Sequence, residues 1–288
     1  LLHVLLLLRD RHPFELRVVH VHHGLSPHAD AWADFCARLC TSHAVESSIH
    51  RVEIARNDAA GIEAAARRER QRIFAALDAD FLLTAHQQDD QAETLLLQLL
   101  RGAGPKGLAA MAELQSRPGW RAAQLRPLLG VTRAGLLDYA QSHGLTWVDD
   151  ESNRDIRYRR NALRRQVMPL LAAHFPGSGA TLARAAALQA DAADLLDDLA
   201  RLDAETAIVG ERLDCALLAG LSRARARNLL RYFIEWHGQP MPNARRLDEA
   251  LHQLRDAGRD ARVCVRLGAA ELWRFRGGAY LVPLAPVP

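Results

Sequence analysis

Segments typical of β-strands alternate with segments typical of α-helices over the first half of this 288-residue chain, and this alternation restricts its fold most. Strand-like runs cover 16–22, 49–54 and 81–86, with a weaker one at 125–129. Helical patterns cover 27–43, 61–77, 89–101 and 132–143. This order predicts an α/β fold with a doubly wound parallel sheet, in which ligands bind beyond the carboxyl ends of the strands.

The pattern changes after about residue 153, where strand signals become rare. Helices are predicted at 158–174, 181–203, 223–237 and 244–257, and short strands at 263–267 and 279–282. The last seven residues, rich in proline, are typical of a linker. We therefore expect an α/β catalytic domain at 1–172 and a mainly helical substrate-binding domain at 173–288.

The apolar run Leu1–Leu8 is predicted to form a buried helix. Eight residues cannot span a bilayer, and the run lacks the basic start and small-residue cleavage site of a signal peptide. Four cysteines without a CxxC pair argue against a disulfide scaffold. Cys36 and Cys40 share a helix face and are expected in the core. The sequence thus predicts a cytoplasmic protein that does not enter membranes.

Arginine dominates the basic residues, because Lys106 is the only lysine among 37 Lys+Arg. A GC-rich coding bias explains this, and arginine is also suited to bidentate phosphate contacts. Six arginines crowd residues 154–165, directly after the acidic turn 149–151. They either present a helix face to phosphates or pair with that turn. A second basic group, which includes Arg227, lies at 223–246.

The densest group of reactive side chains is at residues 84–94, where a predicted strand leads into a helix. Asp90 and Glu93 are three residues apart and share a helix face, and His86 lies on the same side. Such carboxylates bind a metal or an ammonium group, or transfer a proton. Alternatively, they stabilise the helix dipole, with Asp89 as the N-cap.

A second candidate group follows the first strand. His20 and His22 share one strand face, and His23 and Gly24 stand at its end. No carboxylate or cysteine completes a familiar metal-ligand spacing, so no metal site is predicted. The histidines either line a nucleotide cleft or lie in the core. The chain also lacks the GxxxxGK[ST], GxSxG and GxGxxG motifs.

Several short motifs together resemble the tRNA(Ile)-lysidine synthetase family of PP-loop enzymes. The motifs, in chain order, are HVHHGL at 20–25, GIEAAAR at 61–67, TAHQQDDQAET at 84–94, RGAGPKGL at 101–108, RPLL at 126–129, WVDDESN at 147–153 and RNALR at 160–164. Each is weak alone, but their shared order is specific, and the resemblance covers essentially the whole chain.

The resemblance implies a carbon–nitrogen ligase that uses ATP and Mg²⁺. Such enzymes adenylate C2 of the wobble cytidine of tRNA(Ile) with a CAU anticodon, and L-lysine then displaces AMP to form lysidine. Four residues match the catalytic positions: His86, Asp90, Glu93 and Arg160. The positions expected near the nucleotide are His22, His23, Gly24 and Asp89. Those expected at the lysine or tRNA are Arg101, Arg157, Arg164 and Arg227.

This chain departs from the family pattern at two places. Gln87 replaces the usual second histidine, which removes a group that titrates near neutral pH. The family's Ser-Gly-Gly-x-Asp-Ser loop is absent, which suggests that the chain is truncated at its N-terminus and inactive by itself. The family's last domain is also absent after Pro288. The resemblance suggests a homodimer.

Two other functions remain open. A non-catalytic tRNA-binding protein would lack the loop, bind tRNA in a salt-sensitive way and have no affinity for ATP. A related tRNA-thiolating enzyme commonly carries paired cysteines, which this chain lacks.

Overall fold

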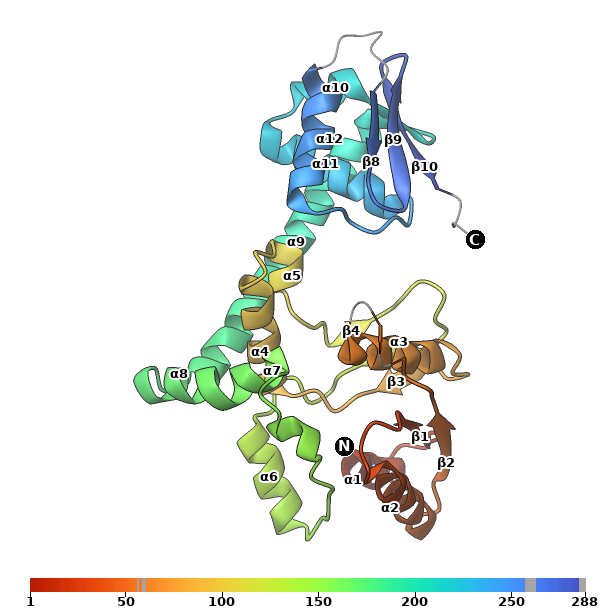
Figure 1. The fold of residues 1–288 in the computed structure, drawn as a ribbon, viewed down its shortest axis with the longest axis vertical. Coiled ribbons are helices and arrows are strands. Elements are labelled where there is room, and N and C mark those ends of the chain that lie inside the picture. Colours follow the sequence, from red (N-terminus) through yellow and green to blue (C-terminus); the bar gives the residue numbers. More distant parts are fainter. Residues whose placement is uncertain (56, 59–60, 257–262, 285–288) are drawn as a thin grey trace. The chain divides into compact units, whose positions relative to one another are not determined.

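The computed structural model describes residues 1–55, 57–58, 61–256 and 263–284. They form two compact units, Leu1–Gln189 and Ala190–Pro288, which are described separately. Helix α9 (Ser178–Ala207) begins in the first unit and ends in the second (Figure 1). The domain boundary expected at residue 172 stays a prediction.

The first sheet of unit 1 pairs β1 (Arg17–His22) with β2 (Glu46–Arg51) in parallel, joined by α2 (Ala29–Ser42). The predicted strand 49–54 therefore begins three residues earlier, at Glu46. Its first three residues are polar and exposed, so hydrophobicity gave no signal there. Pairing with β1 determines the strand instead.

The second sheet of unit 1 has the order β3-β5-β4. Strands β3 (Phe81–Leu83) and β5 (Ala123–Leu125) are parallel, and β4 (Leu114–Gln115) is antiparallel. Helix α3 (Ile62–Ala75) precedes β3, while α4 (Gln88–Leu99) and α5 (Pro105–Leu108) follow it. The α/β class with parallel pairing is confirmed. The weak run at 125–129 contributes only Leu125 to β5, because Pro127 lacks the N–H that a ladder needs.

Helix α1 (Leu2–Arg9) confirms the predicted helix but not its predicted burial, since none of its residues is buried. The nearby β1–β2 sheet has only two strands, too small a surface to cover several apolar helices. His3 instead contacts Tyr139 of α6 (Arg133–Ser142), with 2.8 Å from Nδ1 to the hydroxyl. Helix α6 begins as predicted, because Thr132 accepts a hydrogen bond from the Gly135 N–H.

The predicted helix at 158–174 is present in three parts after a short 3₁₀ turn, η1 (Glu151–Arg154). The α-helical ends α7 (Arg159–Ala162) and α8 (Met168–His174) flank a π-helical turn, η2 (Leu163–Val167). Pro169 explains the widened turn: it has no N–H for a bond to the carbonyl of Arg165, and its ring crowds that carbonyl. π-Turns inside helices often occur at functional sites.

Unit 2 contains helices and a five-stranded antiparallel sheet of order β6-β7-β10-β9-β8. Its elements are β6 (Ile208–Val209), β7 (Arg212–Asp214), α10 (Cys215–Gly220), α11 (Arg223–Trp236), α12 (Ala244–Asp256), β8 (Val263–Arg266), β9 (Ala270–Phe275) and β10 (Gly278–Pro283). Helices α11 and α12 and strands β8 and β10 were predicted. Residue 257, the last of a predicted helix, lies outside the described residues. So do residues 285–288 of the predicted linker.

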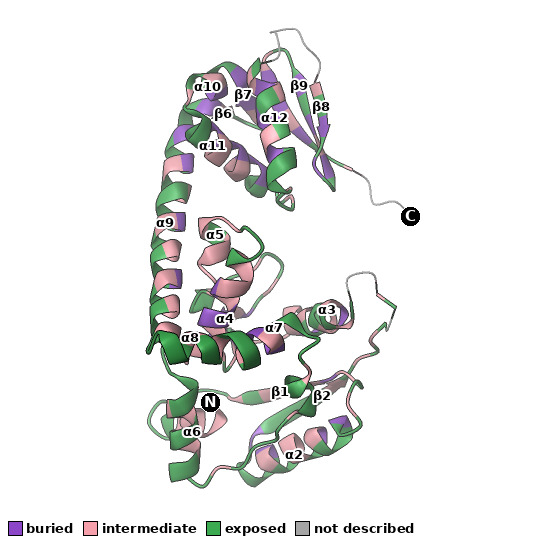
Figure 2. Ribbon diagram, turned by 60° about the vertical axis from the view of Figure 1, so that its left-hand side comes forward, coloured by how far each residue is buried: buried purple, intermediate pink, exposed green. Residues whose placement is uncertain are grey.

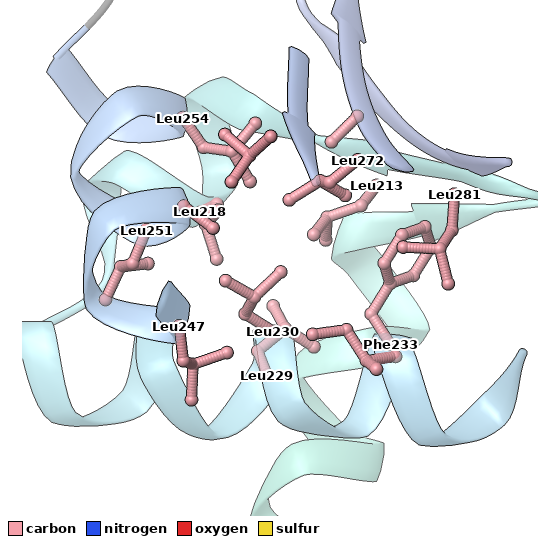
Figure 3. Close-up of a cluster of buried hydrophobic side chains, with 14 of the residues drawn as sticks. Leu213, Leu218, Leu229, Leu230, Phe233, Leu247, Leu251, Leu254, Leu272 and Leu281 are labelled. Atoms are coloured by element: carbon pink, nitrogen blue, oxygen red, sulfur yellow. The ribbon is translucent and has the colours of Figure 1, made fainter. Parts of the chain in front are cut away.

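The core of unit 2 lies between its helices and one face of the sheet (Figure 3). Leu218, Leu230 and Leu254 are completely buried from the helix side, and Leu213 and Leu272 meet them from the sheet. Buried residues are dense in this unit, whereas α2 and α3 carry mostly half-buried and exposed ones (Figure 2). All four cysteines are free thiols; Cys40 is buried as expected, whereas Cys36 is only half-buried. None of the described helices is long and apolar enough to cross a membrane.

Candidate functional site

The start of α4 follows directly from the carboxyl end of β3. Gln87 is the N-cap: its side-chain oxygen accepts from the Asp89 N–H at 2.8 Å, and Asp90 Oδ2 accepts from the Gln87 N–H at 3.0 Å. The alternative that Asp89 is the N-cap is therefore wrong. The cap falls two residues earlier because a reciprocal capping box forms there. This box fixes the backbone on which Asp90 and Glu93 stand.

Arg160 of α7 and Arg164 of η2 bind the two carboxylates of α4. Arg160 donates from Nη2 to Asp90 Oδ1 and from Nε to Glu93 Oε2, both at 2.8 Å. Arg164 donates from Nε to Glu93 Oε1 at 2.6 Å and from Nη2 to Asp90 Oδ1 at 3.1 Å. We call Asp90, Glu93, Arg160 and Arg164 the carboxylate–arginine cluster. It joins residues about seventy positions apart in the chain.

Burial makes this cluster costly unless it is completely paired. The Glu93 side chain is 2% exposed, while the side chains of Arg160 and Arg164 are 30% and 27% exposed. The cluster therefore opens to solvent on its arginine side. Hydrogen bonds to Glu93 raise the pKa of Arg164 above its usual value, partly opposed by burial. The four formal charges cancel, so a cationic ligand could enter only by sharing or displacing a guanidinium contact.

Asn161 fixes the segment that precedes these arginines. Its buried side-chain amide donates to the carbonyls of Ser152 and Asp155 at 2.8 and 3.0 Å. One amide thus closes the loop over η1 and sets where α7 begins. Sequence reasoning included Asn161 only as part of a motif and gave it no role.

His86 lies at the carboxyl end of β3, between this cluster and a group of cations. Its Nδ1 is 2.9 Å from Thr84 Oγ1. Burial lowers the pKa of His86, Asp90 opposes this, and Arg126, Arg160 and Arg70 lower it further. The imidazole is therefore neutral near pH 7 and can accept a proton.

A group of arginines beside His86, of which Arg126 is buried and Arg117 is half-buried, was not singled out as a site from sequence. Arg126 donates to the Ala112 carbonyl at 2.6 Å and to Gln124 Oε1 at 2.8 Å, and Arg117 donates to Gln115 Oε1 at 3.2 Å. The Nε atoms of Arg117 and Arg126 are buried without a partner among the described atoms.

Burial, followed by the charges of Arg117 and Arg67, lowers the pKa of Arg126. Arg67 likewise acts on the pKa of Arg70, where burial is again the largest cause. Arg67, Arg70, Arg117 and Arg126 thus form what we call the arginine group. Their mutual repulsion suits an anion such as a phosphate. Two of these arginines belong to motifs noted in the sequence: Arg67 ends GIEAAAR, and Arg126 begins RPLL.

Of the two histidines at the end of β1, only His23 lies near the arginine group. His22 is buried, and its Nε2 lies 3.3 Å from Asp30 Oδ1, so it is tied to a local ion pair. His23 Nδ1 is buried and has no partner among the described atoms. Burial and then Arg70 lower the pKa of His23, which places it near the arginine group. Gly24 supplies a turn at φ +64°.

The remaining predicted residues do not join the carboxylate–arginine cluster. Asp89 Oδ2 accepts from the Arg133 N–H at 2.9 Å at the start of α6. Arg154 pairs with Asp149 of the acidic turn, as one of the two alternatives predicts. Arg157 is exposed and pairs with Asp155, which lies outside that turn. Arg101 is exposed just beyond the far end of α4.

Arg227 belongs to unit 2, where it pairs with Asp248 at 2.7 Å. Within the described ranges, no group of three or more His, Cys, Asp or Glu side chains could hold a metal. Asp90 and Glu93 are engaged by guanidinium groups instead. The use of Mg²⁺ stays a prediction from the family resemblance.

The fold and motifs agree with known proteins. The PP-loop domain family matches residues 1–171, which is more than half of the chain. The chain belongs to the PP-loop family. A second family, described as the TilS substrate binding domain, matches residues 213–280 within unit 2.

Curated relatives named tRNA(Ile)-lysidine synthase resemble the chain over nearly its whole length. The protein of Azoarcus sp. (strain BH72) is 50% identical over 95% of this chain and 60% of its own length. That of Nitrosomonas europaea is 43% identical over all of this chain and 63% of its own. That of Aromatoleum aromaticum is 47% identical over 98% and 66%. The chain thus spans less than two thirds of the length of these relatives.

One solved structure supports the fold alone. The U34-tRNA thiolase NcsA from Methanococcus maripaludis, determined with its [4Fe-4S] cluster, superimposes with a TM-score of 0.51 at 16% identity. The match covers 64% of this chain and 65% of NcsA.

Proposed function

We propose that this chain is the lysine-ligating part of a tRNA(Ile)-lysidine synthase. The reaction joins L-lysine to C2 of the wobble cytidine at position 34 of tRNA(Ile) with a CAU anticodon, at the expense of ATP. The observation that carries this proposal is the carboxylate–arginine cluster after β3, beside the neutral His86 and the arginine group. The names of the relatives supply the substrate.

The arginine group supports the first half-reaction. In it, the C2 oxygen of cytidine attacks the α-phosphorus of ATP, and pyrophosphate leaves. Arg67, Arg70 and Arg126 bring three positive charges together at this place, and Glu63 partly offsets the charge of Arg70. Such preorganised charge stabilises the negative charge that develops on a departing pyrophosphate. Mg²⁺ would be held by the phosphates themselves, as it commonly is.

The carboxylate–arginine cluster supports the second half-reaction. The lysine ε-ammonium is attracted by Asp90 and Glu93, which here bind guanidinium groups of the same charge. The amine must lose a proton before its nitrogen attacks C2 and the bond from C2 to the AMP oxygen breaks. Asp90 or neutral His86 would accept this proton, and AMP departs with its electron pair.

The other assigned roles follow from the same proposal. His23 and Gly24 line the nucleotide side, and Arg164 orients Glu93. A tRNA substrate places the reaction in the cytoplasm, and the homodimer stays a prediction. The roles of His22, Asp89, Arg101, Arg157 and Arg227 near nucleotide or tRNA also remain predictions.

The test is incorporation of radiolabelled lysine into unmodified tRNA(Ile) by the full-length protein. We expect incorporation that needs ATP and is lost on Asp90→Asn, because the amide cannot attract or deprotonate the ammonium. Incorporation without ATP, or an Asp90→Asn variant with wild-type rates, would refute the assignment. ATP-independent tRNA binding without any lysine transfer would favour a non-catalytic RNA-binding protein.

A further inference from the structure

One face of the sheet in unit 2 is left open by the elements that build its core. Helices α10, α11 and α12 lie on the other side (Figure 1). Along β9, Ala270, Leu272 and Arg274 are buried, so the alternating residues Trp273 and Phe275 point to the opposite face. These two aromatic side chains are 41% and 47% exposed.

The strand register gathers aromatic residues into a row across this face. Tyr280 of β10 is paired with Trp273 of β9, and Trp273 is paired with Cys264 of β8. Directly paired residues on neighbouring strands have side chains side by side on one face. Phe275 lies two positions beyond Trp273 on the same side. We call Arg212, Arg266, Trp273, Phe275, Arg276 and Tyr280 the outer sheet face.

Guanidinium groups surround these rings. The Arg276 guanidinium lies 5.1 Å from the centre of the Phe275 ring. Gly278 leaves room for Arg212 on the adjacent strand, because a Cβ at position 278 would lie 2.7 Å from Arg212 Cγ. Arg266 is paired in register with Glu271 and is exposed.

The two carboxylates on this face are already engaged. Glu271 accepts from the Trp273 indole N–H at 3.1 Å. Asp214 accepts from the backbone of α10 and from Arg212. Among the described residues, Arg266 and Arg276 form no salt bridge, so the outer sheet face keeps an excess of positive charge around its aromatic rings.

We propose that the outer sheet face binds unpaired nucleotides of the tRNA substrate, with bases stacked on Trp273 and Tyr280 and phosphates contacted by Arg266 and Arg276. Exposed aromatic rings on a sheet with flanking guanidinium groups suit single-stranded nucleic acid, because every base has a π-face and every linkage a negative charge. Aromatic residues and arginine are also common in protein–protein interfaces, so association of two copies is a separate outcome of the test. The inference rests on the proposed function for the identity of the RNA.

The test measures RNA affinity by fluorescence anisotropy with the full chain. The probes are a tRNA(Ile) transcript, a short single-stranded RNA and a blunt RNA duplex. We expect Trp273→Ala to weaken binding of the tRNA and the single strand about tenfold, with little change for the duplex. Trp273→Phe should restore most of the affinity, because a stacking surface remains.

A matched control is Trp236→Ala. Trp236 is 53% exposed on α11 of the same unit, away from the sheet, and its removal should leave affinity unchanged. A second measurement uses the exposed thiol of Cys264, beside Trp273. Bound single-stranded RNA should slow its reaction with a maleimide.

Equal RNA affinities of wild type, Trp273→Ala and Tyr280→Ala would overturn the proposal. It would also be overturned if Trp273→Ala changed only the mass of the protein in solution, since the outer sheet face would then join two copies. The readout does not depend on catalysis. Trp273-dependent RNA binding, together with no lysine transfer by the full-length protein, would therefore refute the proposed reaction and support this surface.

Discussion

Replacing Glu93 by glutamine changes the charge of the carboxylate–arginine cluster while preserving the shape of the side chain. Glu93 is almost completely buried and receives hydrogen bonds from both guanidinium groups. In the wild type, two carboxylates balance two arginines. In Glu93→Gln the cluster carries one net positive charge before the lysine ammonium arrives.

The size of the effect follows from the geometry. Two unit charges about 4 Å apart interact by about 4 kcal/mol at an effective dielectric constant of about 20. The arginines are about 30% exposed, so water screens part of this energy. We therefore take about 2 kcal/mol, which corresponds to about a 30-fold loss in kcat/KM for lysine.

The assay is the lysine dependence of tRNA modification at saturating ATP and tRNA. Asp89→Asn is the matched control, because Asp89 lies on the same helix but accepts from the Arg133 N–H, and an amide oxygen can accept that bond too. Its predicted place near the nucleotide does not affect the lysine dependence when ATP is saturating. We expect the control to retain kcat/KM within about threefold. An unchanged kcat/KM in Glu93→Gln would show that the charge balance of the cluster does not govern lysine binding. An equal loss in Asp89→Asn would show that Asp89 also acts on the lysine.

Three further outcomes follow from single contacts. Asn161→Ala should destabilise its loop by about 2 kcal/mol, because two hydrogen bonds of about 1 kcal/mol each are lost, and hydrogen exchange at 151–158 should become faster. The lowered pKa of His86 means that the unfolded state binds its proton first on acidification. The free energy of unfolding that this group contributes should fall as the pH drops below the unfolded-state pKa of about 6.5. His86→Gln should remove that part of the dependence of Tm on pH. A Tm–pH curve that the substitution leaves unchanged would contradict this prediction. Leu230→Ala should cost about 3 kcal/mol in chemical unfolding because Leu230 is completely buried, whereas the exposed Leu202→Ala should cost under about 0.5 kcal/mol.

Local sequence determined much of the secondary structure and placed the carboxylates Asp90 and Glu93 on one face of α4. The periodicity of α11 and α12 was sufficient because their apolar faces are uninterrupted. Strand β9 was missed because Arg274 occupies an inward position and breaks the apolar alternation. Helix α1 was identified correctly, but its exposure depends on what packs against it, which no local pattern contains.

The candidate site divides in the same way. Asp90 and Glu93 could be selected from sequence because their spacing places both on one face of one helix. The pairing with Arg160 and Arg164, and the field of Arg70 and Arg126 on His86, depend on contacts between segments far apart in the chain. Local propensity and periodicity determine what each segment presents. Only the tertiary structure decides which charges meet and how much water is excluded around them, and these two quantities set the strength of every interaction at the site.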